Sequence, residues 1–298
     1  MSSTHVGAEI ASQPQAWRQA AALAHERMTD LPQRGERVAV VGCGTSWFIA
    51  QAYAARREEI GHGETDAFAG SEFPAGRLYD RVVAISRSGT TTEILELLRT
   101  LRGRLRTVAI VGDAASPCAL AADDAVAMPF ADEKSVVQTR FATSALSLLR
   151  AGLGEDVEPL AEAAESAVTW AVPPGHLERQ QFTFLGRGFA VGLANEAALK
   201  MREASLAWAE SYPAMDYRHG PISVSDGSSI VYLVGEGALD LVEDVERTGA
   251  LAVPLREDPQ VALVRLQRLA VANAVHKGLD PDAPRHLTRS VILDARIA

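Results

Sequence analysis

The sequence predicts an α/β protein with two lobes, each built on a parallel sheet. A short apolar run, a G-x-G turn and a long helical pattern follow one another twice, in RVAVVGCGTSWFIAQAYAARREEI from Arg37 and in QFTFLGRGFAVGLANEAALKMREASL from Gln181. The two turns, at Gly42 and Gly186, are separated by nearly half of the chain. A repeat of this size indicates two similar lobes.

Within each lobe, apolar segments alternate with helical patterns, which is typical of a parallel sheet. In the first lobe, strands are expected at 37–41, 81–85 and 106–111, and helices at 46–60, 91–102 and 136–152. In the second lobe, further strands are expected at 229–235 and 251–255, and helices near 239–249 and 259–277.

The segment VPPGHLERQ at 172–180 predicts the linker between the lobes, because paired prolines and a glycine cannot continue the alanine-rich helix before them. The predicted domains are therefore 1–171 and 180–298. A length of 298 residues is enough for about two domains that each bury a core.

Composition limits the function classes. A net charge of -9 and a pI near 5.3 disfavour a nucleic-acid groove. Cys43 and Cys118 are expected to be reduced, since two isolated cysteines make no disulfide framework. No apolar run approaches about 18 residues and the N-terminus lacks a signal-peptide pattern, so we expect a cytoplasmic protein without a membrane segment.

No metal or cofactor is expected. The seven histidines are scattered, without an HExxH pattern or paired-cysteine spacing. The two G-x-G turns also fit a dinucleotide fingerprint poorly, because Trp47 stands at the third glycine position and Gly192 comes one position late. Asp66 lies at about the ribose-acid distance but supports a nicotinamide cofactor weakly.

A group of short hydroxyl side chains follows the strand RVVAIS and begins a helix. Ser86, Ser88, Thr90 and Thr91, with the free N–H groups of the helix start, can surround a phosphate without a metal. Gly89 allows the backbone to approach closely. The alternative is a simple N-cap, but four hydroxyls in six positions exceed what one cap needs.

Charged residues share one face of the helix that follows Gly186. Glu196, Lys200 and Glu203 are spaced i,i+4 and i,i+3, a pattern that can do acid/base chemistry. Spacing alone favours a solvated surface face instead. His219 lies on the next loop, where a lone histidine is by default structural and an imidazole can also move protons near neutral pH.

Several of these segments resemble the isomerase half of glucosamine-6-phosphate synthase and its sugar-isomerase (SIS) domain relatives. FLGRG, NEAALKMREASLAWAESY and YRHGP carry the resemblance, VGCGTSWFIA and SRSGTTTEIL resemble that family's phosphate-side turn and phosphate loop, and QPQAW and GLDPDAPRHLTRSV resemble its N-terminal helix and C-terminal tail. The resemblance runs almost end to end. It implies two SIS lobes of flavodoxin-like type, the second abbreviated and lacking a peripheral strand.

The resemblance also implies roles for individual residues. Glu203 would remove the substrate C2 proton, Lys200 would be a pocket lysine, and His219 would open the sugar ring from a neighbouring subunit, so a homodimer with shared active sites is expected. The phosphate contacts would be Ser46, Ser86, Ser88 and Thr91, and Arg87 would either strengthen that site or point to solvent. The sugar contacts would be Val136, Gln138 and Thr288.

Two departures affect the expected reaction. Arg289 stands where the family has a lysine, and a guanidinium cannot form an imine. Gln138 replaces a sugar-contacting serine. The resemblance covers only the isomerase half of the synthase and not its amidotransferase domain, which makes ammonia from glutamine. Full synthase activity is therefore not expected.

Three functions remain open from the sequence. The first is isomerisation and deamination of an amino-sugar 6-phosphate such as glucosamine 6-phosphate. The second is C2–C3 elimination on N-acetylglucosamine 6-phosphate, and the third is a sugar-phosphate sensor without turnover.

Overall fold

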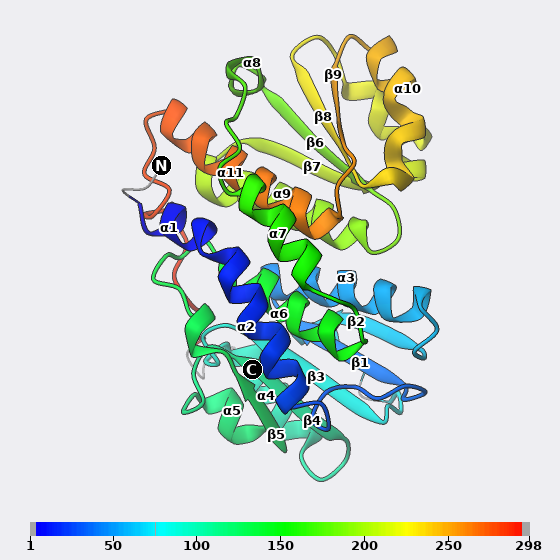
Figure 1. Ribbon diagram of the computed structural model, residues 1–298, viewed down its shortest axis with the longest axis vertical. Helices are drawn as coiled ribbons and strands as arrows, with labels where there is room; N and C mark the ends of the chain where they lie inside the picture. Colours follow the sequence, from blue (N-terminus) through cyan, green and yellow to red (C-terminus); the bar gives the residue numbers. More distant parts are fainter. Residues whose placement is uncertain (1–3, 75, 294–298) are drawn as a thin grey trace. The chain divides into compact units, whose positions relative to one another are not determined.

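The computed structural model describes residues 4–74 and 76–293 and contains two parallel sheets with helices packed on them (Figure 1). The predicted α/β class is confirmed. Both sheets begin with the strand that precedes a G-x-G turn, namely β1 (Val38–Gly42) and β6 (Gln181–Gly186). In each sheet this first strand lies in the interior, between two later strands.

The five-stranded sheet has the order β2-β1-β3-β4-β5, and every neighbouring pair is parallel. Its other strands are β2 (Thr65–Ala69), β3 (Arg81–Ser86), β4 (Arg106–Val111) and β5 (Asp124–Ala127). Strands β1 and β3 are buried at every position, as expected for a parallel sheet covered on both faces. This strand order is the flavodoxin-like one.

Helices cover this sheet and bury its core. They are α2 (Gln13–Glu26), α3 (Thr45–Glu59), α4 (Thr92–Leu101), α5 (Pro117–Ala121) and α6 (Arg140–Gly152). Alternate residues of β1, β3 and β4 pack against the apolar side of α4 and against α5, and α3 packs against α6. The amphipathic pattern of α4, with Ile94, Leu98 and Leu101 buried, accounts for its place on the sheet.

The four-stranded sheet has the order β7-β6-β8-β9, again all parallel. Its other strands are β7 (Trp208–Pro213), β8 (Ser229–Val234) and β9 (Leu251–Leu255), and its helices are α7 (Glu158–Ala167), α8 (Pro174–Leu177), α9 (Ala190–Ser205), α10 (Val242–Arg247) and α11 (Pro259–His276). Helices α9 and α11 pack along each other (Figure 1). The short helix α1 (His5–Ala11) contacts α11.

Grouped by the contacts between residues, the described chain divides into two compact units. Each unit is built from segments that are not continuous in the sequence. The β6 unit comprises residues 4–14, 135–139 and 158–287, and the β1 unit comprises residues 15–134, 140–157 and 288–293. The predicted domain bounds, 1–171 and 180–298, stay a prediction. The segment 135–139 explains why α6 begins at Arg140 and not at 136, because Ser135 is buried and its Oγ donates a hydrogen bond to Glu9 of the β6 unit.

Three strands were not predicted from the sequence. Strands β2, β5 and β7 lie at sheet edges, and the sequences TDAFA, DAVA and WAESYP lack a continuous apolar run because edge strands are partly exposed.

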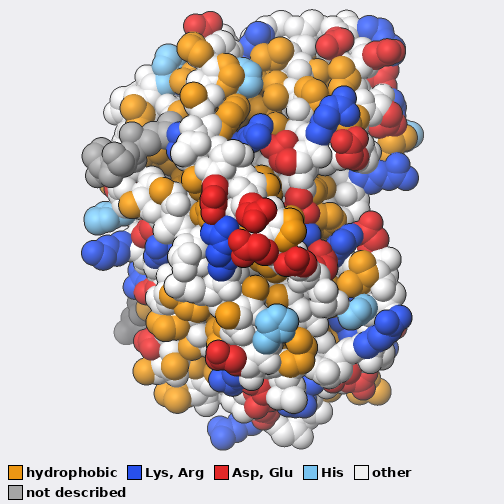
Figure 2. Space-filling view, in the orientation of Figure 1, with side chains coloured by type: hydrophobic (Ala, Val, Ile, Leu, Met, Phe, Trp, Pro, Cys, Tyr) orange, Lys and Arg blue, Asp and Glu red, His pale blue; other side chains and the backbone are white. Residues whose placement is uncertain are grey.

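Among the described residues, no helix is both long and apolar enough to cross a membrane. On the face drawn in Figure 2, acidic and basic side chains are interspersed.

Candidate active site

The phosphate loop, residues 86–91, joins the end of β3 to the start of α4 in the β1 unit. Ser86 Oγ lies 3.2 Å from Thr91 Oγ1 and accepts a hydrogen bond from the Gly89 amide at 3.2 Å. Ser88 Oγ accepts from the Thr90 amide at 3.2 Å. The hydroxyls therefore line a turn at a helix N-terminus, where backbone N–H groups and the helix dipole favour an anion.

Gly89 is required by the shape of this loop. Its φ is +61°, and a Cβ at this position would collide with the side chain of Ser116. Only glycine adopts the left-handed conformation here without both strain and a clash.

Ser46 lies near the start of α3, directly after β1, and is buried. Strands β1 and β3 are neighbours although β2 comes between them in the chain, so the order of the sheet reverses between them. In open α/β sheets, ligands bind outside the carboxyl ends of the strands at such a switch point. Ser46 and the phosphate loop follow the two strands that define it.

Arg87 is buried, with 4% of its surface exposed, so the solvent-facing alternative for this residue is wrong. Its guanidinium forms an ion pair with Glu133, with Nη1 and Oε2 4.0 Å apart, and Nη2 donates to the carbonyl oxygen of Arg289 at 2.8 Å. Glu133 also accepts from the amides of Arg140 and Phe141 at the start of α6. Arg87 thus supports the loop from within the unit.

The segment 288–293 runs along the phosphate loop. Ser290 Oγ accepts hydrogen bonds from Ser88 Oγ at 3.1 Å and Thr90 Oγ1 at 2.8 Å, and the side chain of Arg289 is paired with Asp132. Thr288 Oγ1 donates to the carbonyl of Ser290. Of the predicted site residues, Arg289 and Thr288 therefore lie with the phosphate-loop residues in the same unit.

The charged face of α9 is not a solvated surface. Glu196 and Lys200 have 0% and 1% of their side chains exposed, and Glu203 has 18%. Lys200 Nζ lies 3.4 Å from Glu196 Oε1 and forms a closer ion pair with Glu203 Oε2. The surface interpretation that spacing alone favoured is therefore wrong for this helix.

The two carboxylates determine the protonation state of the buried Lys200. Burial alone would lower the pKa of Lys200, but the attraction of Glu196 and Glu203 and the hydrogen bonds to them outweigh it, so the pKa is raised. Lys200 is therefore a cation at neutral pH. Of its two partners, only Glu203 is accessible enough for a ligand to reach.

His219 ends the 3₁₀ turn at Ala214–His219 and is exposed. The residues before it fix this turn, because Tyr217 is buried with its hydroxyl bonded to Ser225 and Arg218 is paired with Asp244. Gly220, with φ at +142°, then redirects the chain. The turn is held while the imidazole stays accessible.

The two predicted sugar contacts on the segment 135–139 belong to the β6 unit, with Glu203 and His219. Val136 and Gln138 are half-buried, and Gln138 Oε1 has no hydrogen-bond partner among the described residues. Sequence reasoning missed Glu133, Asp132 and Ser290. No spacing signal connects Ser290 to a loop some 200 residues earlier in the chain.

Within the described residues, no group of three or more histidine, cysteine, aspartate or glutamate side chains is arranged to hold a metal ion. Asp66, the candidate ribose acid, lies on β2 and accepts a hydrogen bond from Tyr79 Oη at 2.7 Å. The polar groups gathered after β3 are short hydroxyls and amides, which suit a phosphate.

Comparison with known proteins identifies the class. The family model described as the SIS domain matches residues 31–152, which include all of β1 to β5. Residues 31–152 are therefore a SIS domain.

The chain is similar to particular proteins over most of its length. The chain is 30% identical over 306 residues to the isomerizing glutamine–fructose-6-phosphate aminotransferase of Methanothermobacter thermautotrophicus, covering 87% of this chain and 52% of that protein. It thus spans about half the length of the curated relatives it matches. Among solved structures, it is 25% identical to glucosamine-6-phosphate deaminase from Thermotoga maritima, with a TM-score of 0.78 over 97% of this chain and 100% of that one.

A more distant structure shares the fold. The tagatose-6-phosphate ketose/aldose isomerase of Escherichia coli is 19% identical, with a TM-score of 0.79 over 100% of this chain and 98% of that one. The predicted fold of two SIS lobes is therefore confirmed.

Proposed function

We propose that the chain is a metal-independent enzyme that isomerises and deaminates an amino-sugar 6-phosphate. The observation that carries the proposal is the buried Lys200 between Glu196 and Glu203 on α9. Buried ionisable groups with shifted pKa values are found preferentially at functional sites, and Glu203 is the member of this cluster that a substrate can reach. Support also comes from the likeness to the Thermotoga maritima deaminase.

In this mechanism Glu203 is the carbon base. One of its oxygens, Oε2, is paired with Lys200, which leaves Oε1 to take the proton from C2. Return of that proton to C1 converts the aldose to a ketose-level imine at C2, and water attacking this imine releases ammonia. His219, reaching in from a second subunit, would move protons between ring oxygens during ring opening.

The phosphate would bind at Ser46, Ser86, Ser88 and Thr91. Arg87 lies behind the same loop and adds positive charge, although its ion pair with Glu133 offsets part of this charge. The unpartnered Oε1 of Gln138 is an acceptor for a sugar hydroxyl, and Val136 and Thr288 would complete the sugar contacts.

Elimination on an N-acetylated substrate is the second candidate, and Arg289 is the observation that favours it. Its guanidinium is paired with Asp132 and offers no primary amine for an imine with a keto sugar. After Glu203 removes the C2 proton, the enolate would expel the C3 hydroxyl, which leaves as water with the proton carried by Glu203. An acetylated amine cannot readily leave as ammonia, so this route fits N-acetylglucosamine 6-phosphate.

Product analysis separates the candidates. The protein is incubated with glucosamine 6-phosphate and with N-acetylglucosamine 6-phosphate, and ammonia, ketose and dehydrated sugar are followed by mass. Ammonia and ketose from the first substrate support deamination, and loss of water from the second supports elimination. Binding of either sugar without any product would overturn both and indicate a sensor.

Replacing Ser88 and Thr91 together by alanine should weaken sugar-phosphate binding by about 1–3 kcal/mol, because hydrogen bonds to charged groups are the stronger kind. Calorimetry measures the affinity. Thr100→Ala is the matched control, since its hydroxyl bonds only to the Glu96 carbonyl on the exposed side of α4 among the described contacts. Equal affinity of the double variant and the control would place the phosphate elsewhere.

Mixing inactive Glu203→Gln protein with inactive His219→Ala protein should restore part of the activity. If His219 serves the partner's active site, a heterodimer carries one intact site made of wild-type Glu203 and wild-type His219. Subunit exchange is verified by mass before the assay. Continued inactivity after verified exchange would mean that both residues act within one chain.

A further inference from the structure

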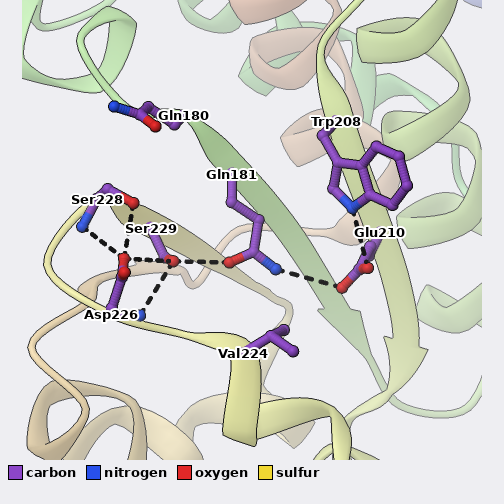
Figure 3. Close-up of a pocket in the computed structure, with 8 residues that line it drawn as sticks. All are labelled: Gln180, Gln181, Trp208, Glu210, Val224, Asp226, Ser228 and Ser229. Atoms are coloured by element: carbon purple, nitrogen blue, oxygen red, sulfur yellow. Dashed lines mark hydrogen bonds between the residues drawn. The ribbon is translucent and has the colours of Figure 1, made fainter.

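A pocket lies at the amino-terminal ends of β6, β7 and β8 in the four-stranded sheet (Figure 3). Its volume is about 400 Å³, within the range of small-molecule sites. Gln181, Trp208, Glu210, Val224, Asp226 and Ser228 are the lining residues that matter for its chemistry. None of its lining residues belongs to the proposed reaction site.

Trp208 provides an open aromatic surface in this pocket. It is the first residue of β7, an edge strand, and 73% of its surface is exposed. Its Nε1 donates to Glu210 Oε1 at 3.2 Å, so the indole has a fixed polar contact while most of the ring remains accessible. Such a ring attracts apolar ligand surface and, through its face, organic cations.

The polar side chains of the pocket are connected in a chain of hydrogen bonds (Figure 3). Gln181 Nε2 donates to Glu210 Oε2 at 3.3 Å, and Ser229 Oγ donates to Gln181 Oε1 at 2.6 Å. The contacts fix the orientation of the Gln181 amide and of the Glu210 carboxylate. A ligand therefore meets polar groups that are already positioned.

The charge of the pocket is negative. Glu210 and Asp226 are its two charged lining residues, and none of the eight residues that line it is basic. Asp226 Oδ1 accepts from the amide and hydroxyl of Ser228, which lowers the pKa of Asp226. Two cations outside the lining bond to carbonyls next to lining residues, Arg179 to Gly227 and Arg202 to Ala209. A phosphate would be repelled here and an ammonium attracted.

We propose that this pocket binds a small hydroxylated amine, with its ammonium group at Glu210 and its carbon skeleton against Trp208, which lies beside Glu210. The hydroxyls would bond to Asp226 and Ser228 at the other end of the hydrogen-bond chain. An unphosphorylated amino sugar has this chemistry. The inference does not depend on the proposed reaction, because no residue of the phosphate loop or of the charged face of α9 takes part.

Calorimetry with glucosamine and N-acetylglucosamine tests the proposal, because the two sugars share a ring and differ in the charged amine. Glucosamine should bind the full chain at least about tenfold more tightly than N-acetylglucosamine. Glu210→Gln and Trp208→Ala should each weaken glucosamine binding by about tenfold, whereas Trp208→Phe should retain most of the affinity. The Ser88→Ala, Thr91→Ala double variant should bind glucosamine like the wild type.

Four outcomes would overturn the proposal. Equal binding of the two sugars would remove the role of Glu210, and no glucosamine binding up to about 50 mM would remove the site. Loss of binding in the phosphate-loop variant would place glucosamine in the proposed active site. A change of oligomeric state in Trp208→Ala, measured by analytical ultracentrifugation, would make the pocket a subunit interface. A failure of the deamination assay leaves this test unaffected, so the two proposals fail separately.

Discussion

Glu203→Gln should lower turnover by about 10²–10⁴-fold while sugar-phosphate binding survives. Glutamine keeps the size of the side chain and removes the proton acceptor. Lys200 retains Glu196 at 3.4 Å in the variant, so the fold of α9 should remain. Steady-state kinetics and calorimetry on the same preparation separate lost chemistry from lost binding.

Hydrogen exchange at carbon gives the sharper measurement. In heavy water the wild type should introduce deuterium at the carbon that receives the proton, provided that the proton exchanges before it returns, and Glu203→Gln should show neither label nor product. Glu243→Gln on the exposed side of α10 is the matched control and should behave like the wild type. Near-normal turnover in Glu203→Gln would make this residue structural and the proposed mechanism wrong.

The sheet interiors were predictable from the sequence because burial on both faces leaves a clear pattern. Runs such as VAVV in β1 and IVYLV in β8 are continuously apolar, as is typical of fully covered parallel strands. Edge strand β7 carries Glu210 and an exposed Trp208 and gives no such signal. Its position depends on pairing with β6, which a single local segment does not encode.

The candidate site was predictable where its residues are close in sequence. The hydroxyls of the phosphate loop lie within six positions, and the glycine that allows the turn lies among them. The burial of Arg87 was not predictable, because it depends on Glu133, which comes from the chain after β5. The burial of the charged residues of α9 was not predictable either, because i,i+3 and i,i+4 spacing is identical for a solvated face and for a buried ion cluster.

Burial of the α9 cluster determines how the fold should respond when its cation is removed. Lys200→Met keeps an unbranched side chain of similar length and leaves Glu196, which is fully buried, without its lysine partner. Breaking a buried ion pair in this way should cost about 3–5 kcal/mol of unfolding free energy. Urea denaturation measures the loss. Arg256→Met, which breaks an exposed pair with Glu236, is the control and should cost no more than about 1 kcal/mol.

The stabilisation by Lys200 should also depend on pH in a defined direction. Because the pKa of Lys200 is raised in the folded protein, its contribution is fully present below the ordinary pKa of a lysine and is lost as the pH rises through the folded value. The difference in stability between wild type and Lys200→Met should therefore be constant near neutral pH and shrink in strongly alkaline solution. Adding Glu196→Gln to Lys200→Met should recover part of the loss, since it removes the buried charge left behind. If Lys200→Met were as stable as the Arg256→Met control, the ion pairs of Lys200 with the α9 carboxylates would not stabilise the fold, and this prediction would be wrong.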